Sequence, residues 1–248
     1  MVSQSHAPLL ETDYNMHKSN STYFSDLDVS RSHLVTYLTR PALAKFKVNA
    51  KTRVVLDPSG KLPGGEPGVM LGAVECSFRR EISPYSPYVM WSRILAWDRK
   101  WLYIVTHFVP KGAARPAEWL DRRFKKLQTR KGGSDAAAAE PDWSKKIYAT
   151  AISKYVFKIG RFTVHPGIVL EQSHLLPPRP GGWRGGDDDM GSQPDLGDAP
   201  DGQEWDWRRI ERQRRKGMEF AQHFLALDGL ESLFDGGKSG AIGKFGLG

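Results

Sequence analysis

The residues best suited to do chemistry stand together near the start of the chain. Asp13, His17 and Asn20 lie within one short stretch. A carboxylate can act as a general base or a nucleophile, and an imidazole or an amide can orient water. Acyl transfer also needs donors directed at the developing oxyanion, which the unpaired N–H groups at a helix start can supply. We therefore expect these three residues to be catalytic and the helix start beside them to bind substrate, through Ser21, Thr22, Tyr23 and Asp26.

Each of these residues also has a structural interpretation. Asp13 could bind the amides of its own loop, His17 could hold that loop on a sheet, and Asn20 could cap a helix. Tyr23 could pack at the pocket wall. Asp26 could compensate the helix dipole or point into the site.

The elements that must position these residues begin with a helix over residues 20–38. Ser19, Asn20, Ser21 and Thr22 are all good N-cap residues. Apolar residues then follow helical spacing. Pro41 is expected to limit how far the helix runs without interruption.

Three runs rich in β-branched and aromatic residues follow, over 69–80, 85–97 and 101–109. Short turns separate them, which predicts consecutive antiparallel strands. A fourth run covers 147–164, with Gly160 as a bend or bulge. A single helix followed by such strands predicts an α+β fold in which the sheet wraps around the helix.

The rest of the chain is predicted to decorate this domain. We expect a domain over 1–175 with an insertion at 110–146 that contains a short basic helix over 116–128. Residues 176–204 are rich in Pro, Gly and Asp and are predicted to be a disordered linker. Residues 205–228 are predicted to form a basic amphipathic helix packed on the domain, and 229–248 a flexible tail.

The segment from Asp13 to Tyr23, DYNMHKSNSTY, resembles the signature of the hotdog-fold thioesterases. That signature is an acid, a Gly-His pair or a variant, a pair of Asn, and a Tyr entering the central helix. Here Met16 stands in place of the Gly and Ser19 in place of the first Asn. The strings HKSNSTYFSDLD, WDRKWLYIVTHFV and YVFKIGRFTVHP are similar to fungal thioesterase-like proteins of secondary-metabolite clusters and to the thioesterase-superfamily member 6 group. The resemblance covers roughly residues 9–175.

The resemblance implies a hotdog fold and a substrate that is an acyl thioester of coenzyme A or of an acyl carrier protein. It also implies a homodimer or a higher homo-oligomer, because hotdog proteins pair their sheets to cover open edges. The expected function is acyl-thioester hydrolysis in fungal lipid or secondary metabolism. The alternatives are a hotdog protein that binds an acyl or polyketide chain without cleaving it, and a dehydratase or cyclase acting on carrier-bound intermediates.

Composition excludes several other classes of protein. Cys76 is the only cysteine, which excludes an internal disulfide and a cysteine-based zinc site and favours a reducing, cytoplasmic location. The histidines have no metal-ligand spacing, so we expect no metal and no cofactor. No stretch is long and apolar enough to predict a membrane span, and the N-terminus does not read as a secretory signal.

Other enzyme motifs are absent from the sequence: it has no Gly-x-Ser-x-Gly, Gly-x-Gly-x-x-Gly or Walker A motif. The net charge of +8 gathers in the two predicted basic helices. Three interpretations of this charge stay open: a solvated surface, recognition of a phosphorylated or acidic acyl carrier, and nucleic-acid binding. The third is the weakest, because no groove-reading motif accompanies the charge, and we expect no nucleic-acid partner.

Overall fold

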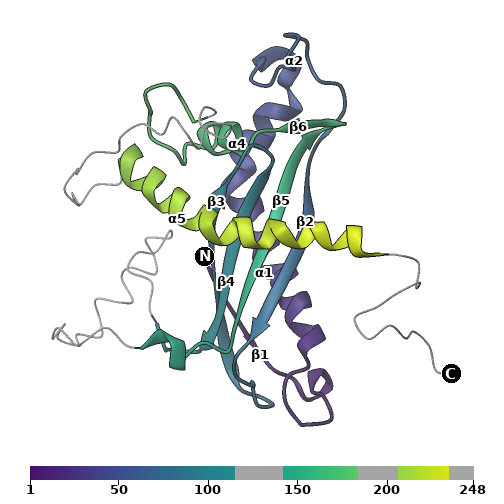
Figure 1. Cartoon of the computed structure of the whole chain (residues 1–248), viewed down its shortest axis with the longest axis vertical. Coiled ribbons are helices and arrows are strands. Elements are labelled where there is room, and N and C mark those ends of the chain that lie inside the picture. Colours follow the sequence, from purple (N-terminus) through teal and green to yellow (C-terminus); the bar gives the residue numbers. More distant parts are fainter. Residues whose placement is uncertain (115–141, 184–205, 235–248) are drawn as a thin grey trace. The chain divides into compact units, whose positions relative to one another are not determined.

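The structure is a computed structural model of the chain, and it describes residues 1–114, 142–183 and 206–234 (Figure 1). The strands are β1 Val2–His6, β2 Pro67–Phe78, β3 Pro87–Trp97, β4 Trp101–Pro110, β5 Ala149–Ile159 and β6 Phe162–Val164. The helices are α1 Asn20–Lys47, α2 Asn49–Thr52, α4 Pro166–Gln172 and α5 Trp207–Ala226, with 3-10 turns η1 Leu9–Glu11, η2 Trp143–Lys145 and η3 Leu227–Leu233.

Helix α1 begins where the sequence predicts and continues beyond the predicted end. It runs to Lys47, with Pro41 inside it. A proline lacks the N–H that would bond four residues back, so the helix loses one bond at Pro41 but keeps its path. The buried residues Ala42 and Phe46 lie beyond the proline. Their burial stabilises the last two turns more than the missing bond weakens them.

The four predicted β runs are all present as strands. In the sheet their order is β1-β3-β4-β5-β2, and β6 pairs with β5. Strand β1 is antiparallel to β3, with Val2 opposite Trp91 and His6 opposite Pro87. The run over 147–164 becomes the hairpin β5–β6, whose turn contains Gly160 at a φ of 56°. The long helix α1 and the antiparallel sheet confirm the predicted α+β class and the hotdog fold.

Contacts within the chain divide it into two compact units. Unit 1 contains Met1–Leu34, Glu75–Arg93 and Val105–Ala151. Unit 2 contains Val35–Val74, Ile94–Ile104 and Ile152–Gly248. Unit 1 therefore holds every candidate site residue named from the sequence, and unit 2 holds α4 and α5.

Helix α5 packs on the end of β3 and the start of β4 within unit 2 (Figure 1). Ala221 and Phe224 of the helix form a buried apolar cluster with Ala96 and Tyr103. Gly217 allows the close approach, since a Cβ there would lie 2.3 Å from the carbonyl oxygen of Leu95. The helix is thus part of the core of its unit.

Some predictions fall on residues outside the described ranges. The basic helix over 116–128 lies wholly among them, as do most of the linker over 176–204 and the end of the tail. Those predictions, and the predicted domain boundaries, stay predictions.

Candidate active site

The candidate site is built on the loop of residues 12–19, called here the helix-start loop, which leads into α1. Its base is closed by a β-bridge between Thr12 and Lys18. The backbone N–H of Asp13 donates to the carbonyl of His17 at 2.8 Å, and that of Ser19 donates to the carbonyl of Glu11 at 2.7 Å. The predicted catalytic residues Asp13 and His17 are therefore neighbours within one closed turn.

The carboxylate of Asp13 organises this turn. Its Oδ1 atom accepts the backbone N–H groups of Asn15 at 2.9 Å and His17 at 3.3 Å. No hydrogen bond to its Oδ2 atom is found among the described residues. Asp13 therefore binds the amides of its own loop, as the structural interpretation of the sequence proposed. This role uses Oδ1 and does not use Oδ2.

Met16 adopts a left-handed backbone conformation, with a φ of 60°. A side chain at such a position costs of order 1 kcal/mol, whereas glycine adopts it freely. The position of Met16 in the motif is the one where the hotdog signature has Gly. Met16 therefore holds the turn in a left-handed conformation that glycine would adopt with less strain.

The helix start is open to solvent. Asn20 and Ser21 are exposed, and the Ser21 hydroxyl lies 3.0 Å from that of Ser19. The backbone N–H of Thr22 donates to the carbonyl of Ser19 at 3.0 Å, and its hydroxyl donates to the same oxygen at 2.8 Å. The Thr22 amide is therefore engaged within the turn, and the backbone N–H groups of Asn20 and Ser21 are better candidates for an oxyanion.

Tyr23 is buried, with only 2% of its surface exposed. Its ring lies 5.0 Å from those of Phe78 and Phe108, in edge-on and tilted contacts. Aromatic pairs in these geometries stabilise a core beyond the area that they bury. Its position fits the predicted packing role.

A buried cluster that the sequence analysis missed lies beneath the helix-start loop. The Lys18 ammonium is fully buried, 2.7 Å from a carboxylate oxygen of Glu11 and 2.9 Å from one of Asp26. It also lies 5.5 Å from the ring centres of Tyr23 and Tyr88. We call these five residues the Lys18 cluster.

Asp26 accepts hydrogen bonds in this cluster, whereas one interpretation of the sequence assigned it to compensate the helix dipole. It lies beyond the first turn of α1, which contains no acidic residue. Its Oδ2 atom accepts hydrogen bonds from Lys18 and from the Tyr88 hydroxyl. Burial raises the pKa of Tyr88, and the hydrogen bond to Asp26 raises it further. The Tyr88 hydroxyl therefore stays protonated and acts as a donor to the Asp26 carboxylate.

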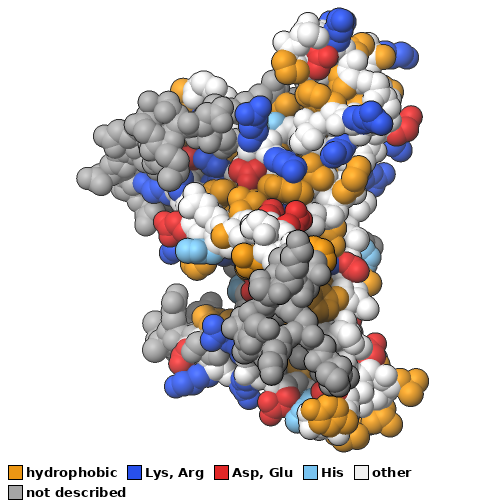
Figure 2. Space-filling model, turned by 45° about the vertical axis from the view of Figure 1, so that its right-hand side comes forward, with side chains coloured by type: hydrophobic (Ala, Val, Ile, Leu, Met, Phe, Trp, Pro, Cys, Tyr) orange, Lys and Arg blue, Asp and Glu red, His pale blue; other side chains and the backbone are white. Residues whose placement is uncertain are grey.

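Large apolar side chains are exposed next to this site. Leu10 is 99% exposed and Tyr14 is 94% exposed, while Leu9 and Met16 are about half exposed. Hydrophobic side chains gather at the lower end of Figure 2, the end at which the segment before α1 lies in Figure 1. Contiguous exposed apolar surface of this kind marks an interaction site more often than a free surface.

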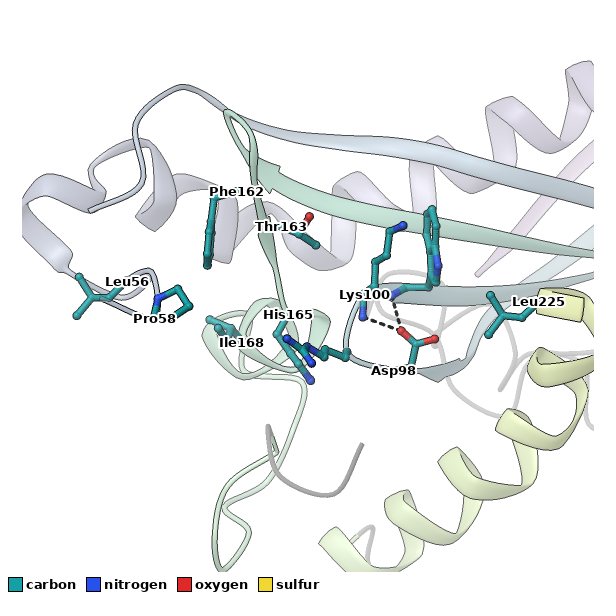
Figure 3. Close-up of a pocket in the computed structure, with 11 residues that line it drawn as sticks. Leu56, Pro58, Asp98, Lys100, Phe162, Thr163, His165, Ile168 and Leu225 are labelled. Atoms are coloured by element: carbon teal, nitrogen blue, oxygen red, sulfur yellow. Dashed lines mark hydrogen bonds between the residues drawn. The ribbon is translucent and has the colours of Figure 1, made fainter. Parts of the chain in front are cut away.

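A separate cavity of about 690 Å³ lies in unit 2. Figure 3 shows it between the β3–β4 turn, β6 and the start of α4, with Leu225 of α5 at one end. Its walls are mostly apolar, and none of the candidate residues in unit 1 lines it. The Asp98 carboxylate at its edge accepts the backbone N–H groups of Lys100 and Trp101 at 2.7 and 2.6 Å. That charge is therefore used to form the turn.

Within the described ranges, no group of three or more His, Cys, Asp or Glu side chains is arranged to hold a metal ion. No helix in the described part of the chain is both long and apolar enough to cross a membrane.

Comparison with known proteins gives a consistent result. Residues 7–140 match the family model of the thioesterase-like superfamily. The thioesterase poxG of Penicillium oxalicum is 38% identical over 252 residues, which covers 100% of this chain and 74% of that protein. The thioesterase lcsJ of Purpureocillium lilacinum is 36% identical over 232 residues, covering 88% of this chain and 64% of that protein. The solved structure of the gentisyl-coenzyme A thioesterase BH1999 is 13% identical with a TM-score of 0.40, and the match covers 70% of this chain and 99% of that chain.

Proposed function

The chain belongs to the thioesterase-like superfamily and is a thioesterase, and we propose that it hydrolyses the thioester of an acyl or polyketide chain carried by coenzyme A or by an acyl carrier protein. The fungal relatives poxG and lcsJ cover 100% and 88% of this chain, which supports a role in fungal lipid or secondary metabolism.

One observation carries the proposed mechanism: a carboxylate is fixed by backbone amides in the loop that leads into a long helix. Asp13 is the proposed general base or nucleophile, acting through Oδ2 while Oδ1 is held by the turn. The N–H groups of Asn20 and Ser21 are the proposed oxyanion donors, aided by the partial positive charge of the α1 N-terminus. His17 and Asn20 are proposed to orient water, and Ser21 and Thr22 are proposed to form the substrate side of the site. Tyr23 and Asp26, which the sequence also predicted to bind substrate, instead contribute to the Lys18 cluster.

A second copy of the chain is the proposed partner at this site. The helix-start segment exposes Leu10 and Tyr14 almost completely, and the end of the edge strand β2 in the same unit exposes Phe78. Edge strands with apolar side chains are normally covered in a native assembly. The mass of the protein in solution tests this partner, and a stable monomer would contradict it.

The test of the mechanism is Asp13→Asn. Asn keeps an oxygen that can accept the amides of Asn15 and His17, so the turn is expected to hold while the base is lost. We expect thiol release from a panel of acyl-coenzyme A esters to fall by roughly a thousandfold, the scale seen when an essential catalytic group is removed. Turnover within threefold of the unchanged protein would remove Asp13 from the mechanism.

The chain offers a matched control in Asp57. Its Oδ1 atom accepts the backbone N–H groups of Ser59 and Lys61, both at 2.8 Å, with the same sequence offsets as those around Asp13. Asp57→Asn therefore changes an equivalent turn in unit 2. It is expected to leave turnover unchanged, so that a loss in Asp13→Asn alone reports chemistry rather than turn geometry.

A non-catalytic acyl-binding protein is the second candidate, favoured by Met16 and Ser19 at signature positions that carry Gly and Asn. It predicts that acyl-coenzyme A esters raise the melting temperature without any release of thiol. A dehydratase or cyclase would instead convert a carrier-bound substrate into an enoyl or cyclised product, which mass spectrometry distinguishes from the free acid.

A further inference from the structure

We propose that Lys18 is a positioning residue of this thioesterase, holding in place the helix-start loop that carries Asp13 and leads into α1. The expected change in kcat rests on the proposed function. The expected hold of Lys18 on the loop rests only on the contacts of Lys18 itself. The residue pattern of the loop alone gives no role to Lys18.

Lys18 joins the base of the loop to three other segments of unit 1. Its ammonium contacts Glu11 at the end of η1 and Asp26 in α1. Its backbone N–H donates to the carbonyl of Ile82 at 2.8 Å, in the segment before β3. Because Thr12 pairs with Lys18, these attachments fix the residue directly before Asp13 as well.

The charge balance of the cluster favours a specific role over general core stability. A fully buried ammonium loses its hydration, and replacing a whole buried ion pair with apolar residues of similar size is often neutral or stabilising. Here the ammonium faces two carboxylates, of which Glu11 is 39% exposed and Asp26 is 18% exposed. The partially exposed acids can rehydrate, whereas Lys18 cannot. The arrangement therefore makes the position of the loop depend on one buried cation.

The geometry also determines which kinetic parameter should respond. The Lys18 ammonium is fully buried and paired with Glu11 and Asp26, so an acyl group at the exposed helix start would not contact it. Its loss would displace Asp13 without removing a surface that binds the acyl group. Displacing a reacting group by about 1 Å can cost about a hundredfold in rate. The loss should therefore appear in kcat, with KM little changed.

The experiment compares Lys18→Met with Lys154→Met in the full chain. Lys154 is the matched control because it is another buried lysine, paired with Asp228 at 2.6 Å, in unit 2. For Lys18→Met we expect kcat to fall by about 10- to 100-fold, with KM within threefold. For Lys154→Met we expect kcat to be unchanged. A kcat of Lys18→Met within twofold of the unchanged protein would overturn the proposal.

A second variant covers the case in which Lys18→Met does not fold. Glu11→Gln weakens one attachment of the ammonium but leaves Asp26 in place, and the exposure of Glu11 makes the change tolerable. We expect kcat to fall by about threefold to tenfold. The two substitutions combined should be no worse than Lys18→Met alone, since both act through one contact. An unchanged kcat in Glu11→Gln, or losses that multiply, would contradict the proposal.

Hydrogen exchange separates this proposal from the proposed function. Amides in residues 12–19 are expected to exchange at least tenfold faster in Lys18→Met than in the unchanged protein, and not in Lys154→Met. If no acyl-coenzyme A ester is hydrolysed but exchange accelerates, the proposed function fails and the role of Lys18 in holding the loop stands. Unchanged exchange refutes that role whatever the activity.

Discussion

Replacing Glu211 with Gln tests how α5 is held in unit 2. The Glu211 side chain is 2% exposed. One of its oxygens accepts from Arg214 Nε at 2.9 Å and Arg179 Nη1 at 3.3 Å, and the other accepts from Arg215 Nε at 2.9 Å and Arg214 Nη2 at 3.0 Å. One buried anion thus connects two arginines of its own helix with Arg179, which lies before the helix.

The expected cost follows from how well these arginines can regain water. Removing one partner of a buried ion pair typically costs about 3–5 kcal/mol. Arg215 is 25% exposed and can rehydrate, while Arg179 and Arg214 are almost buried. Gln keeps the shape and one acceptor oxygen. We therefore expect Glu211→Gln to lower the free energy of unfolding by about 2 kcal/mol at pH 7.

The cost should depend on pH. Burial alone would raise the pKa of Glu211, but the hydrogen bonds and charges of Arg214, Arg215 and Arg179 outweigh it and lower the pKa below its ordinary 4.5. A carboxylate with a lowered pKa stabilises the fold above its ordinary pKa, and this contribution is lost as the pH falls through the folded value. The difference between the unchanged protein and Glu211→Gln should therefore shrink below about pH 4.5.

Urea unfolding at several pH values measures this difference. Glu219→Gln is the control, because Glu219 is exposed on the same helix, and it is expected to change stability by less than about 0.5 kcal/mol. A Glu211→Gln difference that stays constant from pH 7 to pH 3.5, or that is no larger than that of Glu219→Gln, would refute the ionic account of how α5 is held.

Three further predictions concern stability and reactivity. Lys154→Met should change the free energy of unfolding, measured in urea, by less than about 1 kcal/mol. Asp228→Asn should lower it by about 2 kcal/mol, because the buried ammonium then loses its counter-charge. A larger loss for Lys154→Met than for Asp228→Asn would contradict this account. Gly217→Ala should cost about 2–3 kcal/mol by overpacking, while Gly229→Ala, with open space around it, should be neutral; equal effects would contradict the close approach of α5. Burial raises the pKa of Cys76 to about 11, so alkylation in the folded protein should keep accelerating to about that pH, and a plateau near pH 8.5 would contradict it.

The elements of the fold could be predicted because their signals are local. The alternation and turn residues of the strands mark β3 and β4 to within about two residues. The end of α1 could not be predicted in the same way. Pro41 is a local signal to stop, and the burial of Ala42 and Phe46 that outweighs it depends on residues distant in the sequence.

The site residues likewise differ in whether local sequence signals could identify them. Asp13 and His17 could be named because their types and spacing form a recognisable motif, and the structure places them in one turn. Lys18 could not, because a lysine in a polar loop normally faces water. Its burial depends on Asp26 and Tyr88, which lie elsewhere in the chain. The sequence contains one weak indication of this burial. The acids Glu11 and Asp26 lie on either side of Lys18, which is the one lysine of the motif.

The packing of α5 has a consequence for how much of the chain the domain needs. The family match ends at residue 140, before β5 and α5. A protein shortened to the matched residues would lose strand β5 and also Ala221 and Phe224 of α5, the buried partners of Ala96 and Tyr103. The apolar cluster would then be open to water, and such surfaces associate. The end of the family match is therefore not a boundary at which this protein can be cut, and helix α5 should be retained in any shortened version made for study.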